Sequence, residues 1–124
     1  GTHAEDGIQY DESTNILTSR RYIYAGQSDQ GSISIDLSTN WHHIVQTFNK
    51  DSSTKMLYLD SSLAITYTTN LVIDSSLWFV IGCEVAFLTD LRGLNKYLFD
   101  QFRFYDREIT EEEVISLYND GYGV

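Results

Sequence analysis

Short apolar segments alternate along this chain with clusters of Ser, Thr, Asn, Asp and Gly, a pattern that predicts an all-β domain. In residues 33–37 apolar and polar side chains alternate with a period of two, as in a strand with one buried face. Residues 78–82 are apolar throughout, which predicts a central strand buried on both faces. Further strands are predicted at 16–24, 41–48, 56–60, 63–68 and 97–105.

The connections between these strands are predicted from their turn-forming residues. We expect a turn at 28–31, a hairpin loop at 49–54 and a tight hairpin at 61–62. Residues 84–96 are expected to be the longest irregular stretch. We place one domain at residues 8–124 and interpret residues 1–7 as an expression remnant or a disordered segment.

One helix is predicted near the C-terminus. Thr110 and Glu113 have the spacing of a capping box, in which each side chain accepts a hydrogen bond from the other residue's backbone N–H. The apolar residues at helical spacing are Ile109, Val114, Leu117 and Tyr118. Capping also explains the acidic run 111–113, which we therefore interpret as a helix start rather than a metal or acid–base site.

Composition and charge exclude several classes of protein. Of the 124 residues, 42% are hydrophobic and 14% aromatic, which excludes a disordered chain, and no apolar run approaches the length of a membrane span. Eight Lys and Arg against 18 Asp and Glu give a net charge of −10, which argues against binding to nucleic acid or to anionic lipid. A single cysteine, Cys83, excludes a disulfide framework, and we interpret it as a buried apolar residue.

Four motifs occur in a fixed order, at residues 41–48, 57–60, 80–82 and 99–119. With these motifs the chain resembles the laminin-G-like group of the concanavalin A-like lectin/glucanase superfamily, over residues 33–121. The resemblance implies an antiparallel β-sandwich of the jelly-roll type, with one short helix packed on its rim. It also implies that Phe102 and Phe104 lie on the buried side of a closing strand.

Three departures from the family pattern affect the expected structure. Asp60-Ser61 stands where the family has an Asp-Gly turn, and Tyr97 replaces a glycine before the closing strand. By this resemblance, the strands with which the family usually opens are missing from the chain. A sandwich without them exposes an apolar face or an unpaired edge, so we expect the chain to self-associate, with a second copy covering the gap.

Metal binding is not expected from the histidines. His42 and His43 follow each other on a strand, so their rings point to opposite faces and cannot bind one ion; we expect one to be hydrogen-bonded in the core and the other to face solvent. Asp100 has two open interpretations. The resemblance allows it to bind calcium together with backbone carbonyls. It is equally able to accept hydrogen bonds from Arg103, Arg107 or loop amides. Because no D-x-D-x-D-G loop is present, no cofactor is expected and calcium stays open only through the resemblance.

Catalysis is not expected either. Glycan-hydrolysing members of the superfamily use paired carboxylates in an E-x-D-x-x-E arrangement on one strand face, and this spacing does not occur in the chain. Nor does a G-x-S-x-G, an H-E-x-x-H or a phosphate-binding glycine loop. We therefore predict that the protein is not an enzyme.

Recognition is the function that these exclusions favour. The candidate ligand-binding residues, all in or just after the 84–96 segment, are Asp90, Arg92, Asn95 and Tyr97. For these residues a solvated turn is an equally open interpretation, and for Tyr67 and Trp78, two further aromatic candidates, a place in the core is favoured.

The predicted function is non-catalytic recognition of a glycan or glycosylated partner. By the resemblance, such a domain belongs to an adhesion, cell-surface or phage-tail protein, so that the expected location is extracellular, on a cell surface or on a virion. The alternative is a structural or oligomerisation domain that has no sugar site and completes its sandwich with a second copy.

Overall fold

The computed structural model is mainly β and describes residues 4–23, 26–71, 84–87, 90–92 and 98–120. Its strands form three antiparallel sheets, ordered β1-β2-β3, β4-β5-β6 and β7-β8. The first sheet, sheet A, consists of β1 (Ala4–Asp11), β2 (Ile16–Ile23) and β3 (Gln27–Ser34). The second, sheet B, consists of β4 (Ile44–Asn49), β5 (Thr54–Leu59) and β6 (Ser62–Thr68). A small hairpin of β7 (Glu84–Phe87) and β8 (Asp90–Arg92) and the helix α1 (Glu111–Asp120) complete the described elements.

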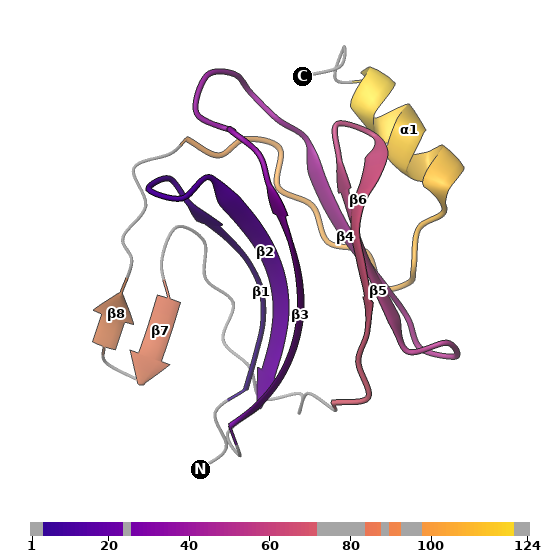
Figure 1. Ribbon diagram of the computed structural model, residues 1–124. Coiled ribbons are helices and arrows are strands. Elements are labelled where there is room, and N and C mark those ends of the chain that lie inside the picture. The colour runs from indigo at the N-terminus through magenta and orange to yellow at the C-terminus, as the bar shows by residue number, and fades with distance from the viewer. Residues whose placement is uncertain (1–3, 24–25, 72–83, 88–89, 93–97, 121–124) are drawn as a thin grey trace.

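Sheets A and B face each other, and β3 contacts β6 across the gap between them (Figure 1). Their apolar core is built on Leu17, Leu57 and Ile65, which are almost completely buried. Gly31 permits the close approach, because a Cβ atom at this position would lie 2.5 Å from Cγ2 of Ile65. The all-β sandwich predicted from the alternating pattern is thus confirmed.

A third layer, the helix α1, covers the outer side of sheet B. Tyr58 follows Leu57 on β5, with a register irregularity between the two, and packs against Ile109 and Val114 instead of the inner core. The predicted capping box is confirmed: Glu113 N donates to Thr110 Oγ1 (3.2 Å), and Thr110 N donates to Glu113 Oε1 (2.9 Å). The helix therefore starts at Glu111, directly after the predicted capping residue Thr110.

The chain reversal between β2 and β3 differs from the prediction. Residues 28–31, expected as a turn, belong to β3 and pair with β2, and the chain reverses just before them. Gly26 has φ of 79°, and its N–H donates to Ile23 O (3.1 Å). Glycine adopts this left-handed conformation without strain, whereas the polar residues that suggested a turn lie along a half-exposed strand.

The β5–β6 hairpin has a two-residue turn at Asp60 and Ser61, with φ of 48° and 71°. Two positive φ values identify the type I′ turn that matches the twist of paired strands. Ser61 therefore takes the left-handed conformation for which the family has glycine. The predicted hairpin is confirmed, with its turn one residue earlier than expected.

Further expectations from the sequence do not agree with the structure. Residues 35–37, predicted as part of a strand at 33–37, lie in the connection after β3, which ends at Ser34. No strand is formed by residues 98–105, and Phe102 and Phe104 are 53% and 71% exposed, not buried. An alternating pattern alone does not form a strand, because the segment also needs a partner ladder. The 84–96 segment contains the β7–β8 hairpin rather than being irregular, and β1 begins at Ala4, so residues 4–7 pair with β2. Residues 78–82, the expected central strand, lie outside the described residues.

Candidate functional site

Three chain connections meet at one end of the sandwich, at the top of Figure 1: the β1–β2 turn, the β3–β4 connection and the β5–β6 turn. The β3–β4 connection, residues 35–43, is tied to both neighbours. Ile35 N donates to Asn15 O, and Asp60 N donates to His43 O, each at 2.8 Å. Backbone hydrogen bonds at both ends hold this long connection in place. A binding loop needs such support because its side chains must keep a fixed geometry.

A histidine–aspartate pair anchors the C-terminal half of the connection. Nδ1 of His42 lies 2.7 Å from Asp60 Oδ2, and the backbone N–H of His43 donates to Asp60 Oδ1 at 2.9 Å. Both rings are half-buried, so the expected core histidine is found, but the expected solvent-facing one is not. The ring of His43 lies 6.0 Å from that of Tyr118 on α1, and this packing explains its burial.

At this end of the sandwich the pKa values of His43 and Asp36 are both lowered. Burial lowers the pKa of His43, the charge of Asp60 opposes that shift, and Arg103 adds to it. The pKa of Asp36 is also lowered, first by its hydrogen bonds from Ser38 and then by the charge of His42. Nε2 of His42 and Nδ1 of His43 are buried and have no hydrogen-bond partner within the described part of the chain.

Trp41 is the most conspicuous side chain of this end, since 51% of it is exposed close to the C-terminal end of the β3–β4 connection. On one side of it along the chain, Asp36 Oδ1 accepts hydrogen bonds from the backbone N–H and the hydroxyl of Ser38 (2.8 and 2.5 Å). On the other side stands the His42–Asp60 pair. An indole offers a flat apolar face and one N–H donor, and carboxylates offer acceptors. We call residues 36–42 the Trp41 rim.

The residues that the sequence suggested as a ligand site are not tested by the structure. Asp90 and Arg92 begin and end β8, where their backbones pair with Phe87 and Glu84, but their side chains lie outside the described set. Asn95 and Tyr97 are among the residues that the structure does not describe, as is Trp78. These four positions remain a prediction.

Tyr67 is described, and its hydroxyl lies 3.1 Å from Ser19 Oγ between the sheets, in agreement with a core role. In the sequence, Trp41 stands out only as part of a family motif. Its exposure has no signal in the sequence, although the Asp-x-Ser spacing at 36–38 is typical of the turn that precedes it.

No cluster of three or more His, Cys, Asp or Glu side chains able to hold a metal occurs among the described residues. Of the alternatives weighed for Asp100, the structure shows a loop amide, since Gln101 N donates to its carboxylate at 2.8 Å. Arg107 forms a two-pronged ion pair with Glu113, at 2.9 and 2.5 Å. None of the described helical residues forms a segment with the length and apolarity to cross a membrane.

Comparisons with known proteins identify the family. The fold resembles that of an S-layer domain-containing protein (residues 221–444) from Clostridium thermocellum ATCC 27405, with a TM-score of 0.53 and 16% sequence identity. That likeness covers 94% of this chain but only 63% of the other chain. A search of curated proteins found no match. The Laminin_G_3 family model matches residues 4–115, a region that includes sheet A as well as the motifs recognised in the sequence. The chain therefore belongs to this family of the concanavalin A-like lectin/glucanases superfamily.

Proposed function

We propose that this domain is a non-catalytic recognition module that binds a glycan or a glycosylated partner at the Trp41 rim. The observation that carries the proposal is the half-exposed indole of Trp41 on a connection held by hydrogen bonds at both ends. A sugar ring has an apolar face that stacks on an indole and hydroxyls that donate to carboxylates such as that of Asp36. Family membership supports this choice of ligand class.

A cell-surface setting belongs to the same proposal. The structural neighbour is an S-layer domain-containing protein, and the family is that of lectin-like domains. A rim with a pinned loop is suited to a ligand that approaches the end of the sandwich, such as a glycan on a neighbouring surface.

Glycan-array binding tests the proposal. We expect the wild-type chain to bind at least one neutral glycan class and Trp41→Ala to lose that binding. Phe104→Ala is the matched control, because Phe104 is more exposed but lies outside the rim. Loss of binding in Asp90→Ala or Arg92→Ala, with Trp41→Ala unaffected, would move the site to β8. A silent array with folded wild-type protein contradicts glycan recognition.

A second candidate function is a structural domain that self-associates. The observation in its favour is a group of exposed apolar side chains between β8 and α1, with Leu98, Phe99 and Phe104 exposed by 78%, 56% and 71%. Light scattering coupled to size exclusion measures the mass over a range of concentrations. A concentration-dependent dimer that Phe104→Ser shifts to monomer supports this function, and a monomer at every concentration contradicts it.

A further inference from the structure

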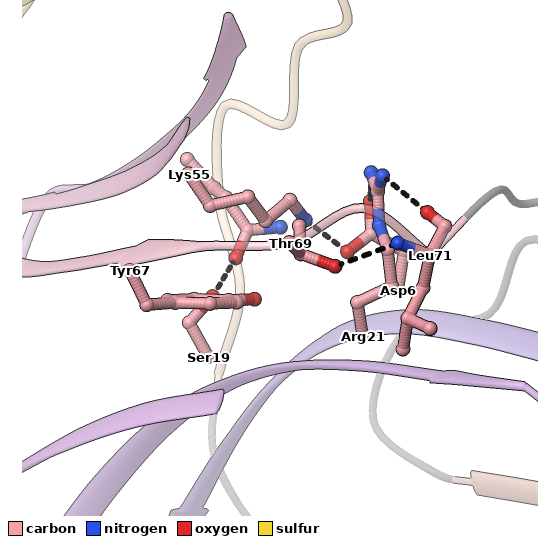
Figure 2. Close-up of polar contacts among 8 residues, drawn as sticks. Asp6, Ser19, Arg21, Lys55, Tyr67, Thr69 and Leu71 are labelled. Carbon is pink, nitrogen blue, oxygen red and sulfur yellow. Dashed lines mark hydrogen bonds and ion pairs between the residues drawn. The ribbon is translucent and has the colours of Figure 1, made fainter. Parts of the chain in front are cut away.

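A row of charged side chains lies between the two sheets (Figure 2). By strand register it is at the end of the core opposite the Trp41 rim. Lys55 on β5 is only 1% exposed, and its Nζ contacts Oδ1 of Asp6 on β1. The other oxygen of the same carboxyl group, Oδ2, accepts a hydrogen bond from Arg21 Nη2 at 3.1 Å. Arg21 Nη1 donates to the carbonyl of Leu71 at 3.2 Å. The carboxyl group of Asp6 is thus held by two cations from two different strands.

Strand register brings these groups together. Asp6, Arg21 and Asp29 lie opposite one another on β1, β2 and β3, so they share the face of sheet A that looks toward sheet B. On sheet B, Lys55 lies opposite Tyr67 and Phe48.

Aromatic residues flank Lys55 on both neighbouring strands of sheet B. The guanidinium of Arg21 stacks 4.4 Å above the ring of Phe48, and Tyr67 lies on the other side of Lys55. An ammonium in such surroundings loses its hydration, and burial is accordingly the first cause that lowers the pKa of Lys55, ahead of the opposing charge of Asp6. Desolvation that favours the neutral amine is how lysines become nucleophiles in proteins.

We propose that Lys55 and Asp6 condense to an intramolecular amide that joins β1 covalently to β5. Lys55 first passes one proton to Oδ1 of Asp6, which its Nζ contacts. The neutral Nζ then attacks Cγ of Asp6, and the new N–C bond forms as the Cγ–Oδ1 bond breaks. Two protons of the ammonium leave with Oδ1 as one water molecule, so an ammonium and a carboxylate become one neutral amide and no oxidant or other reactant is needed. Arg21 holds Oδ2, where negative charge develops during the attack and where the product has its carbonyl oxygen.

The charges that remain support this assignment. Before condensation the row contains two cations, Arg21 and Lys55, and two carboxylates, Asp6 and Asp29. Condensation consumes one of each and leaves Arg21 opposite Asp29, so the interior stays electrically balanced. It also removes a buried ammonium, whose desolvation is costly even when it is paired.

The bond would close a loop between positions 49 residues apart and would fasten the edge strand β1 to the centre of sheet B. Such a link restricts the unfolded chain, as a disulfide does, but it withstands reducing agents. This inference does not depend on the proposed glycan site.

Intact-mass measurement of the purified full chain tests the proposal. We expect the wild-type protein to be lighter than its sequence mass by one water molecule, and Lys55→Arg and Asp6→Ala to have their full sequence masses. Lys50→Arg is the matched control on an exposed lysine, and it should keep the water loss. A folded wild-type chain of full mass overturns the proposal, and so does a water loss that persists in Lys55→Arg.

A second measurement uses only the wild-type chain and therefore does not depend on whether the variants fold. It is peptide sequencing by mass spectrometry. After proteolysis, fragmentation should identify one branched peptide in which the segment containing Asp6 is joined to the segment containing Lys55. Separate, unmodified peptides for both segments, recovered in full yield, would also overturn the proposal.

Discussion

The two ends of the sandwich interior are built from the same strands but held by different forces. At one end Leu17, Leu57 and Ile65 form an apolar core, and at the other Arg21 and Lys55 meet Asp6. Apolar burial is non-directional and adds up with area, whereas a buried ion pair stabilises only while both partners are in place. We therefore expect the apolar end to provide most of the stability and the charged end to favour one arrangement of the strands.

Truncation at the apolar end is expected to have the largest effect. Leu57 is fully buried, so Leu57→Ala leaves a cavity and should lower the free energy of unfolding by about 3 kcal/mol. Chemical denaturation measures the loss. Leu63→Ala on β6 is the control, because Leu63 is 47% exposed, and its cost should be well under half as large. Equal losses in both variants would show that the core is not centred on Leu57.

Removal of one partner of the ion pair at the charged end should have the second-largest effect on the free energy of unfolding. Asp6→Ala leaves the buried ammonium of Lys55 without its carboxylate and should cost about 2 kcal/mol, less than a fully enclosed pair because 27% of the Asp6 side chain is exposed. The cost is greater if the amide proposed above has formed.

The double variant Asp6→Leu/Lys55→Met is the informative comparison for this pair. It replaces the pair by apolar groups of similar size, so it should recover most of the stability lost in Asp6→Ala. Chemical denaturation of the two variants measures this recovery, as a higher denaturation midpoint for the double variant than for Asp6→Ala. If the double variant is as unstable as Asp6→Ala, these side chains stabilise the fold by more than their mutual ion pair.

Gly31 lies between the two ends and tests how closely the sheets approach. Gly31→Ala places a Cβ 2.5 Å from Cγ2 of Ile65, so side chains must shift at a cost of about 1 kcal/mol. Gly7→Ala is a matched control on the same sheet, since nothing lies within 4 Å of its added Cβ. Thermal unfolding should rank Gly31→Ala below Gly7→Ala, and the reverse order would contradict the packing.

The smallest effect on stability is expected from the exposed ion pair between Arg107 and Glu113. Hydrogen bonds from Arg107 are the main cause that lowers the pKa of Glu113 from 4.5 to about 2. Because the folded value is the lower one, the contribution of this group to stability is present above pH 4.5 and is lost as the pH falls toward 2. Carboxyl NMR titration should show the low pKa, and Arg107→Gln should return it toward 4.5. An unchanged titration in Arg107→Gln would contradict the ion pair as its cause.

Local patterns in the sequence predicted several elements close to their observed bounds. The strands predicted at 56–60 and 63–68 correspond to β5 and β6, and the capping box fixed the start of α1. The same patterns failed where a partner was required: residues 98–105 alternate like a strand but do not form one, and residues 28–31 look like a turn but pair with β2. The ligand residues proposed from the sequence stay a prediction, because the described side chains do not include them.

By itself, then, the sequence determined the β-rich family fold, the capped helix and the acidic character of this protein. Only the tertiary structure decided that Trp41 is exposed on a pinned connection and that Asp6 meets Lys55 from a strand 49 residues away. The physical reason is distance along the chain. Caps and periodicity arise between near neighbours, whereas contacts across the sandwich depend on the register of every intervening strand, which no single segment encodes.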